Sequence, residues 1–465
     1  MKNFKRVLAI IMTILLITLA AGCSKTSNSA SNTSETSSNS NTATKEVVTI
    51  KYANWNLGTE EENNLERQMI QAFMETHPNI KVEIDESIST QDWNGSLATA
   101  AASGEMPDVF MLINVPTGIA NGWLYDLSSL AQNDNEWNQI PKNITDTINY
   151  NGKIYAVPFA EHFMGYYINK DIFDKENITP LKFGFTVDEF KKAVLDLTKP
   201  SKGIIGLDNE SEIIDWYPGA VSNKYGWYTW DGKGFNLTSQ EFIDGINLAK
   251  TFDKAGAVFN ALSDEQKAKI AGSKDANAWQ TGHVAIHWDG TWMIPDFKKN
   301  LNFNWAFVGI PNGRTPVTLD YLGISKSTKH PQEAYEFAKW MSFSKEGYLK
   351  RLELAQKSGI YVNSLPIMND KELIDKFISL ANVEGLKEAY DNINNSFVEG
   401  FKFIPGYVDA RWNAPTGIKI GDKDNATIGD VLWNAPKLGL KIEDYVNQLN
   451  KLANEKYQEA EKAIK

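Results

Sequence analysis

Strand and helix patterns alternate along the first part of this chain, and this alternation constrains its fold more than any other feature. Val47–Tyr52 has the composition of a strand, Glu60–Glu75 repeats apolar residues at helical spacing, and Ile80–Ile84 alternates as a second strand. A helical segment, Asp92–Ala102, and a short buried strand, Asp108–Leu112, follow. Because each strand reaches the next through a helix, the pattern predicts βαβ crossovers and a parallel sheet.

The first 22 residues are predicted to be a lipoprotein signal peptide. Basic residues precede the apolar run Val7–Ala20, which as a helix of about 21 Å is shorter than the roughly 30 Å hydrocarbon core of a bilayer. Cys23 is the only cysteine, and the residues before it resemble a bacterial lipobox. We expect acylation of Cys23 and a Ser/Thr/Asn-rich tether over 23–45, which cannot bury apolar surface. An ordinary secretory signal with a chance cysteine is the alternative.

The remaining body, Glu46 to Lys465, is too long for one core and suits two lobes. The formal charge of −11 and the lack of a basic patch argue against nucleic acid as a partner. No further apolar run approaches membrane-spanning length. Later helices are predicted near 187–199, 239–254, 332–342 and 442–464.

The segment GHVAIHWDGTW, residues 282–292, contains two histidines four residues apart. On a helix His283 and His287 would share a face and could share a zinc ion. The segment is short, begins and ends near glycines, and alternates Val284, Ile286 and Trp288, which is typical of a strand. On a strand the two histidines are roughly 13 Å apart, at about 3.3 Å per residue. We therefore predict that they do not share a metal ion.

Recognisable catalytic motifs are missing from the sequence, which contains no P-loop, GxSxG, HExxH or strand–GxGxxG–helix pattern. Carboxylates are plentiful, but none lies in a recognisable glycosidase pair. Asp422–Asp430 faintly resembles a calcium loop, although it lacks the glycine at position six and the final glutamate, and a helix-capping loop is the alternative. We expect no enzymatic activity, no metal and no cofactor.

Aromatic residues are the most informative feature of the body. The chain has 14 Trp and 17 Tyr, and many of them are next to Asn, Asp or Gly. Indole rings pack on the C–H faces of sugars, while carboxylates, amides and guanidinium groups bond the hydroxyls. Each single tryptophan could equally belong to a core. Several of them at strand-to-helix loops, where α/β sheets bind ligands, favour a carbohydrate site.

Six segments resemble, in order, motifs of the extracellular solute-binding proteins of bacterial ABC sugar importers. They are ASGEMPDV (102–109), NGWLYDL (121–127), GKIYAVP (152–158), YYINKD (166–171), GHVAIHWDGTW (282–292) and PQEAYEF (331–337). Three positions depart from the family pattern: Ile168 separates a tyrosine and an asparagine that are usually adjacent, Ile286 replaces a methionine, and Leu112 replaces an aromatic residue.

The resemblance implies an α/β, periplasmic-binding-protein-like fold of two lobes with a hinge and an inter-lobe cleft. We expect one lobe to contain 46–161 and 322–366, and the other 162–321 and 367–465. The implied partners are an oligosaccharide or another sugar, the transmembrane permease subunits of an ABC importer, and the membrane through the lipid anchor at Cys23. A monomer on the extracytoplasmic face of a Gram-positive-type cell membrane is expected.

The same resemblance suggests the ligand contacts. The tryptophan that ends the family's GxW motif stacks on sugar, and Trp292 occupies that place, whereas no ligand role is implied for the two histidines before it. We expect changes at both histidines to leave sugar affinity nearly unchanged. The alternatives are a surface lipoprotein that hydrolyses polysaccharide or one that adheres to it. The full set of expected ligand residues is Trp55, Asn56, Asn114, His162, Asp215, Trp216, Asp289, Trp292, Arg411 and Trp412.

Overall fold

A computed structural model describes residues 46–362 and 364–465 of the chain. The predicted signal peptide, Cys23 and the tether lie outside the described residues. Within the described part, no helix combines the length and the apolar character that a membrane crossing requires.

The predicted βαβαβ start of the body is confirmed. Strands β1 (Val48–Ala53), β2 (Ile80–Ile84) and β3 (Val109–Leu112) are connected through helices α1 (Leu65–Thr76) and α2 (Trp93–Ser103). Strand β1 lies between the other two and is parallel to both. The carboxyl ends of the three strands therefore meet at one edge of the sheet, where α/β proteins bind ligands.

Capping residues explain where these helices begin and end. Helix α1 begins five residues later than the sequence pattern suggested, because the Asn64 side chain accepts a hydrogen bond from the backbone N–H of Arg67 and caps the helix there. Asp92 caps α2 in the same way, and Gly104 ends it in the left-handed conformation, with φ of 76°.

The large sheet is mixed rather than wholly parallel. Its strand order in the described residues is β2-β1-β3-β10-β6-β8-β7, where β7 spans Ile205–Leu207. Strand β11 (Phe397–Val398) pairs with β10, and β9 (Trp305–Gly309) pairs with β6. Strand β10 (Pro316–Ile324) is antiparallel to both β3 and β6 (Val157–Asn169). Sequence periodicity gives the presence of a strand but not its direction. Among the described residues, the expectation of parallel pairing holds for β1–β3, for the β7–β8 pair and for the short β10–β11 pair.

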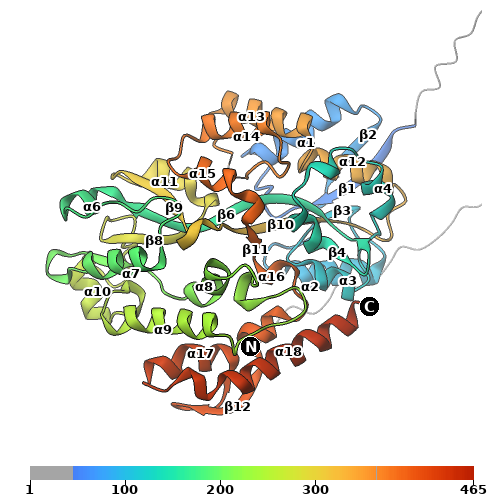
Figure 1. Ribbon diagram of the computed structural model, residues 1–465. Coiled ribbons are helices and arrows are strands. Elements are labelled where there is room, and N and C mark those ends of the chain that lie inside the picture. Colours follow the sequence, from blue (N-terminus) through green and yellow to red (C-terminus); the bar gives the residue numbers. More distant parts are fainter. Residues whose placement is uncertain (1–45, 363) are drawn as a thin grey trace, which may run out of the picture. The chain divides into compact units, whose positions relative to one another are not determined.

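Strand β6 connects the two halves of this sheet. All 13 of its residues are buried. Its first half, Val157–Phe163, pairs with β10, whereas Met164–Ile168 pair with β8 (Val284–Gly290). Residues Tyr166–Asn169 also pair with β9 on the other side. Figure 1 shows β6 running through the middle of the body from β10 to β8 and β9.

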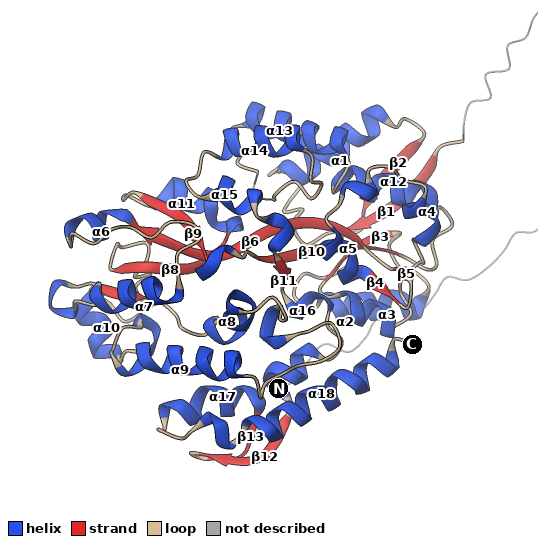
Figure 2. Cartoon of the chain, viewed as in Figure 1, coloured by secondary structure: helices blue, strands red, loops and turns tan. Residues whose placement is uncertain are grey.

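Helices cover both faces of the strands (Figure 2) and complete two hydrophobic cores. One core contains Phe73, Phe110 and Phe337, and the other contains Phe190 and Trp216. Helix α14, which the sequence assigned to the second lobe, contributes Leu373 and Phe377 to the first core, so the proposed lobe boundary near 366 stays a prediction. Helix α14 spans Lys371–Ala381. In the described part of the chain the other α-helices of six or more residues are α3 (Val115–Ala120), α6 (Lys170–Lys175), α7 (Val187–Asp196), α8 (Ile213–Val221), α9 (Gln240–Lys254), α10 (Asp264–Ala271), α11 (Ile294–Asn300), α12 (Pro331–Met341), α13 (Lys345–Ser358), α15 (Leu386–Asp391), α17 (Ile428–Lys437) and α18 (Val446–Ala463).

The segment that resembled a calcium loop is a hairpin followed by a helix cap. Strands β12 (Pro415–Ile420) and β13 (Lys423–Thr427) precede α17. Backbone N–H groups of Thr427 and Asp430 each donate to the side chain of the other residue, which is a reciprocal cap. This arrangement agrees with the helix-capping interpretation.

Candidate functional site

The segment 282–292 folds as the sequence predicted. Strand β8 spans Val284–Gly290, so His283 directly precedes it and His287 lies within it. The two histidines have different surroundings. The His283 ring bonds the carbonyl oxygen of Gly203 at 2.8 Å, and His287 bonds Asp208 at 2.5 Å. Among the described residues no group of three or more His, Cys, Asp or Glu side chains could hold a metal ion.

Trp292 lies in the turn after β8, and close packing fixes its indole ring. A Cβ atom on Gly290 would lie 2.0 Å from that ring, so only glycine permits this approach. The neighbouring Thr291 hydroxyl accepts a hydrogen bond from the backbone N–H of Phe163 on β6 at 3.2 Å. The Trp292 ring remains 37 % exposed and meets His162 edge-on, with centroids 5.5 Å apart. The structure therefore brings two predicted site residues together beside β6.

Charge surrounds the other predicted residue of this strand, Asp289. Its Oδ2 lies 3.4 Å from Nε2 of His287, and its Oδ1 accepts from the backbone N–H of Gly290 at 2.7 Å. The His287 ring stacks on Trp279, with centroids 4.8 Å apart. Burial disfavours the charged ring, but Asp208 and Asp289 outweigh burial and raise the pKa of His287 to about 9. Sequence reasoning missed this ion pair because Asp208 lies 79 residues away.

Trp55 and Asn56 follow β1, as predicted from the resemblance. The Trp55 ring is half-buried and meets Trp93 edge-on at 5.1 Å. Both rings line a cavity of about 840 Å³ together with Glu60, Glu86 and other residues of the loops after β1 and β2. Trp93 is one of the tryptophans that lie next to Asp or Asn in the sequence, but the sequence did not predict its contact with Trp55.

Asn114 follows β3 and caps α3, where its side chain accepts from the backbone N–H of Thr117 at 2.9 Å. It also lines a cavity of about 200 Å³ whose opposite wall consists of Phe401, Tyr407 and Asp409 with the end of α18. Asn114, which lies next to the first core, therefore shares this cavity with residues of the C-terminal segment. Asn114 can offer its amide N–H₂ group here, because the cap uses only the amide oxygen.

Three other predicted ligand residues are buried in this conformation, whereas a side chain that contacts a ligand must be accessible. They are Asp215, Trp216 and Arg411. Two guanidinium nitrogens of Arg411 donate to the Asp215 carboxylate at 2.7 and 3.0 Å. The Trp216 ring is fully buried, and its indole N–H donates to the hydroxyl of Tyr166 at 3.1 Å. The structure therefore places these three side chains in the packed interior of the protein.

Trp412 is next to Arg411 but faces outward. Both belong to a single π-helical turn, Asp409–Asn413, a form that is frequent at functional sites. The Trp412 ring is 36 % exposed and packs edge-on against Tyr407 at 5.3 Å. The Arg411 guanidinium lies 5.7 Å from the centre of the Trp412 ring, so the buried ion pair supports the exposed indole.

Two glutamates near the buried ion pair escaped the sequence analysis. Burial, with Asp215 nearby, raises the pKa of Glu212 to about 7. Burial also raises the pKa of Glu399, although the Thr318 hydroxyl donates to it at 2.6 Å. Titratable groups with raised pKa values cluster at functional sites. No local motif marks these glutamates, because their environment comes from segments that are distant in sequence.

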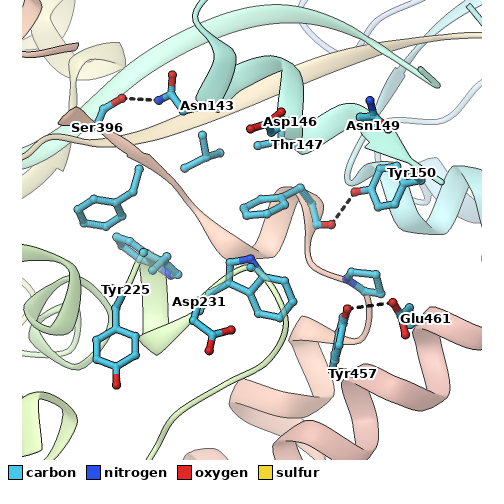
Figure 3. Close-up of a pocket in the computed structure, with 18 of the residues that line it drawn as sticks. Asn143, Asp146, Thr147, Asn149, Tyr150, Tyr225, Asp231, Ser396, Tyr457 and Glu461 are labelled. Atoms are coloured by element: carbon cyan, nitrogen blue, oxygen red, sulfur yellow. Dashed lines mark hydrogen bonds between the residues drawn. The ribbon is translucent and has the colours of Figure 1, made fainter. Parts of the chain in front are cut away.

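Another groove, of about 730 Å³, contains none of the predicted site residues (Figure 3). Tyr225, Asp231 and Tyr457 lie along it, opposite helix α5 (Lys142–Thr145), which carries Asn143. Its polar groups bond one another: Asn143 donates to Ser396 at 2.7 Å, and the Tyr457 hydroxyl donates to Glu461 at 3.1 Å. We therefore do not include it in the candidate site.

Changing Asp215 to alanine is expected to reduce the free energy of unfolding by about 3–5 kcal/mol, because Arg411 would stay buried without its counter-charge. Urea denaturation followed by circular dichroism measures this change. Asp409→Ala, which removes an exposed carboxylate from the same π-helical turn, is the control and should cost less than about 1 kcal/mol. Equal stability of the two variants would contradict the supporting role of the ion pair.

Comparisons with known proteins agree with this geometry. The family model described as bacterial extracellular solute-binding protein matches residues 58–347. An uncharacterized ABC transporter extracellular-binding protein of Pyrococcus horikoshii is 27 % identical over 414 residues, 85 % of this chain and 91 % of that protein. The multiple sugar-binding protein of Streptococcus mutans is 25 % identical over 331 residues, covering 64 % of this chain and 72 % of its own length.

A solved structure supports the same fold. The cyclo/maltodextrin-binding protein complexed with maltotetraose superposes with a TM-score of 0.65 at 16 % identity, covering 89 % of this chain and 98 % of the other. The predicted two-lobed α/β fold is thereby confirmed, and members of the family are binding proteins rather than enzymes. Because the family model matches more than half of its length, this chain belongs to the bacterial extracellular solute-binding proteins of ABC transporters.

Proposed function

We propose that this protein binds an oligosaccharide between its two lobes and delivers it to the transmembrane permease of an ABC importer. The observation that carries the proposal is Trp292: a glycine-dependent turn holds a partly exposed indole against His162, beside the strand that both halves of the sheet share. An exposed aromatic ring beside hydrogen-bonding groups is the arrangement that sugars require.

The contacts that we propose are a subset of those expected from the sequence. Trp55, Trp292 and Trp412 each expose part of a ring and supply the stacking surfaces. Asn56, Asn114, His162 and Asp289 supply hydrogen-bonding groups around them. Asp215, Trp216 and Arg411 act behind this surface as its support, since each is at least nine-tenths buried.

Binding at residues from both lobes explains how a sugar would promote closure. A ligand shifts a conformational equilibrium only by the difference between its affinities for the two states. Trp55 follows β1 in one half of the sheet, and Trp292 follows β8 in the other half. A sugar that touches both rings at once binds the closed state more tightly, and the permease then recognises that state.

A melting-temperature panel tests the proposal. The panel contains monosaccharides, linear maltodextrins and cyclic oligosaccharides, and a ligand at 100 times its Kd adds about 2.7 kcal/mol of stability. The sugar should be recovered unchanged after incubation with a stoichiometric amount of protein. Shorter products, absent with heat-inactivated protein, would favour the polysaccharide hydrolase. Binding to insoluble polysaccharide without any effect of soluble sugars would favour the adhesin.

Replacing Trp292 with alanine is expected to weaken binding of the identified sugar by ~2 kcal/mol or more, the scale of a buried aromatic anchor. This corresponds to roughly thirtyfold in Kd, measured by isothermal titration calorimetry. Gly290→Ala should weaken binding as well, because its Cβ would displace the indole. Trp433→Ala on α17 is the control and should retain wild-type affinity. Wild-type affinity of Trp292→Ala would place the sugar elsewhere.

The cellular setting of the proposal includes a lipid anchor and a monomeric protein on the extracytoplasmic face of the cell membrane. Acylated Cys23 would hold the protein beside its permease, and the tether over 23–45 would let the body reach it. In the native host, Cys23→Ala should move the protein from the membrane fraction to the medium, as measured by immunoblotting of both fractions. Equal membrane retention of the Cys23→Ala and wild-type proteins would refute the anchor.

A further inference from the structure

His287 is held between two carboxylates that belong to different elements. Its Nδ1 lies 2.5 Å from Oδ2 of Asp208, which follows β7 (Ile205–Leu207), and its Nε2 lies 3.4 Å from Oδ2 of Asp289 on β8. The ring planes of His287 and Trp279 are only 15° apart, with centroids at 4.8 Å. The stacking fixes the orientation of the imidazole, so both ring nitrogens stay directed at carboxylate oxygens.

This geometry selects the doubly protonated ring. A neutral imidazole has one N–H donor and one nitrogen with a lone pair. In this arrangement the lone pair would face a carboxylate oxygen, which is repulsive. Only the imidazolium donates to Asp208 and at the same time turns an N–H, rather than a lone pair, towards the Asp289 carboxylate at 3.4 Å. A charge-assisted hydrogen bond such as the one to Asp208 is roughly twice as strong as a neutral one.

The other groups that face His287 are aromatic and uncharged. Phe297 of α11 meets the ring edge-on at 5.7 Å, and Tyr167 of β6 is its partner across the sheet. Burial, with Asp289 nearby, raises the pKa of Tyr167 well above its usual range, so this phenol stays neutral. Among the described residues, the charges that act on His287 are therefore those of Asp208 and Asp289.

The same two carboxylates also hold the backbone before the Trp292 turn. Oδ1 of Asp208 accepts from the backbone N–H of Trp288 at 3.3 Å. Oδ1 of Asp289 accepts from the backbone N–H of Gly290 at 2.7 Å, and Gly290 is the residue on which the Trp292 ring packs. His287 thus joins the ends of β7 and β8 at the point where the turn begins.

We propose that His287, protonated on both ring nitrogens, is a positioning residue for the sugar site, because it aligns Asp289 and the turn that presents Trp292. This inference rests on the proposed function and deepens it. It also replaces the expectation, drawn from the sequence, that neither histidine affects sugar affinity. His283 keeps that expectation, since its ring bonds only a backbone carbonyl oxygen.

The first arm of the test needs no sugar. Nuclear magnetic resonance of the full chain labelled with ¹⁵N-histidine reports the protonation of each ring nitrogen, and His287→Gln identifies the signals of His287. Both ring nitrogens should be protonated at pH 7.5 and titrate near pH 9. Because the pKa rises from 6.5 to about 9 on folding, the contribution of His287 to stability is complete below pH 6.5 and is lost as the pH rises through 9. One protonated nitrogen at pH 7.5 would overturn the proposal.

The second arm measures affinity, with the panel sugar that gives the largest rise in melting temperature. The wild-type Kd should rise roughly tenfold between pH 8 and pH 10, the effect of losing about 1.4 kcal/mol of binding free energy. His287→Gln should bind roughly tenfold more weakly at pH 7.5 and show no titration near pH 9. His283→Gln, at the residue directly before the same strand, is the matched control, and it should keep the wild-type Kd and pH profile.

The outcomes separate this inference from the proposed function. If no panel sugar binds the wild-type protein, the proposed function fails and the positioning role fails with it. If the wild-type protein binds sugar but His287→Gln binds equally well with the same pH profile, the positioning role is wrong and the proposed function stands. If His287→Gln does not fold, the wild-type pH profile decides alone, and a constant Kd up to pH 10 refutes the role.

Discussion

The pairing of β6 with both halves of the sheet is the interaction on which the rest of the structure depends. Its backbone bonds β10 up to Phe163 and β8 from Met164 onward, so a single strand transfers from one half to the other without a loop. Every residue of the strand is buried, and buried backbone groups must be paired. His162 and the Trp292 turn lie at this transfer.

Alternation along β6 gives the two faces of this region different chemistry. His162 meets Trp292, whereas its neighbour Phe163 packs on Tyr390 with ring centroids 4.9 Å apart. Glu161 is buried on the Phe163 side of the strand, and burial raises its pKa well above the usual range. A neutral carboxyl there adds no charge to the crossing. The pleat thus places His162 and the aromatic turn on the opposite side of the strand from Glu161 and Phe163.

The sequence sufficed for features with a local cause. Helix α2 follows from Asp92 and Gly104, and the strand that separates His283 from His287 follows from alternation between two glycines. It did not suffice where the environment comes from distant segments. Trp216 was expected at the ligand because it lies between an aspartate and a tyrosine, but the packing of α8 buries its ring completely. The role that we propose for His287 was missed for the same reason, since its partner Asp208 follows another strand, β7.

The buried ion pair shows why a polar motif can be near a site without contacting its ligand. Arg411 and Trp412 are adjacent, and a π-helical turn directs one inward and the other outward. The guanidinium is compensated by Asp215, to which the Tyr407 hydroxyl also donates at 3.3 Å, and the Tyr407 ring in turn contacts Trp412. Removing one member would leave an uncompensated buried charge behind the indole. In the site that we propose, the pair would preorganise the surface that Trp412 presents, because it holds the exposed ring in place independently of any ligand.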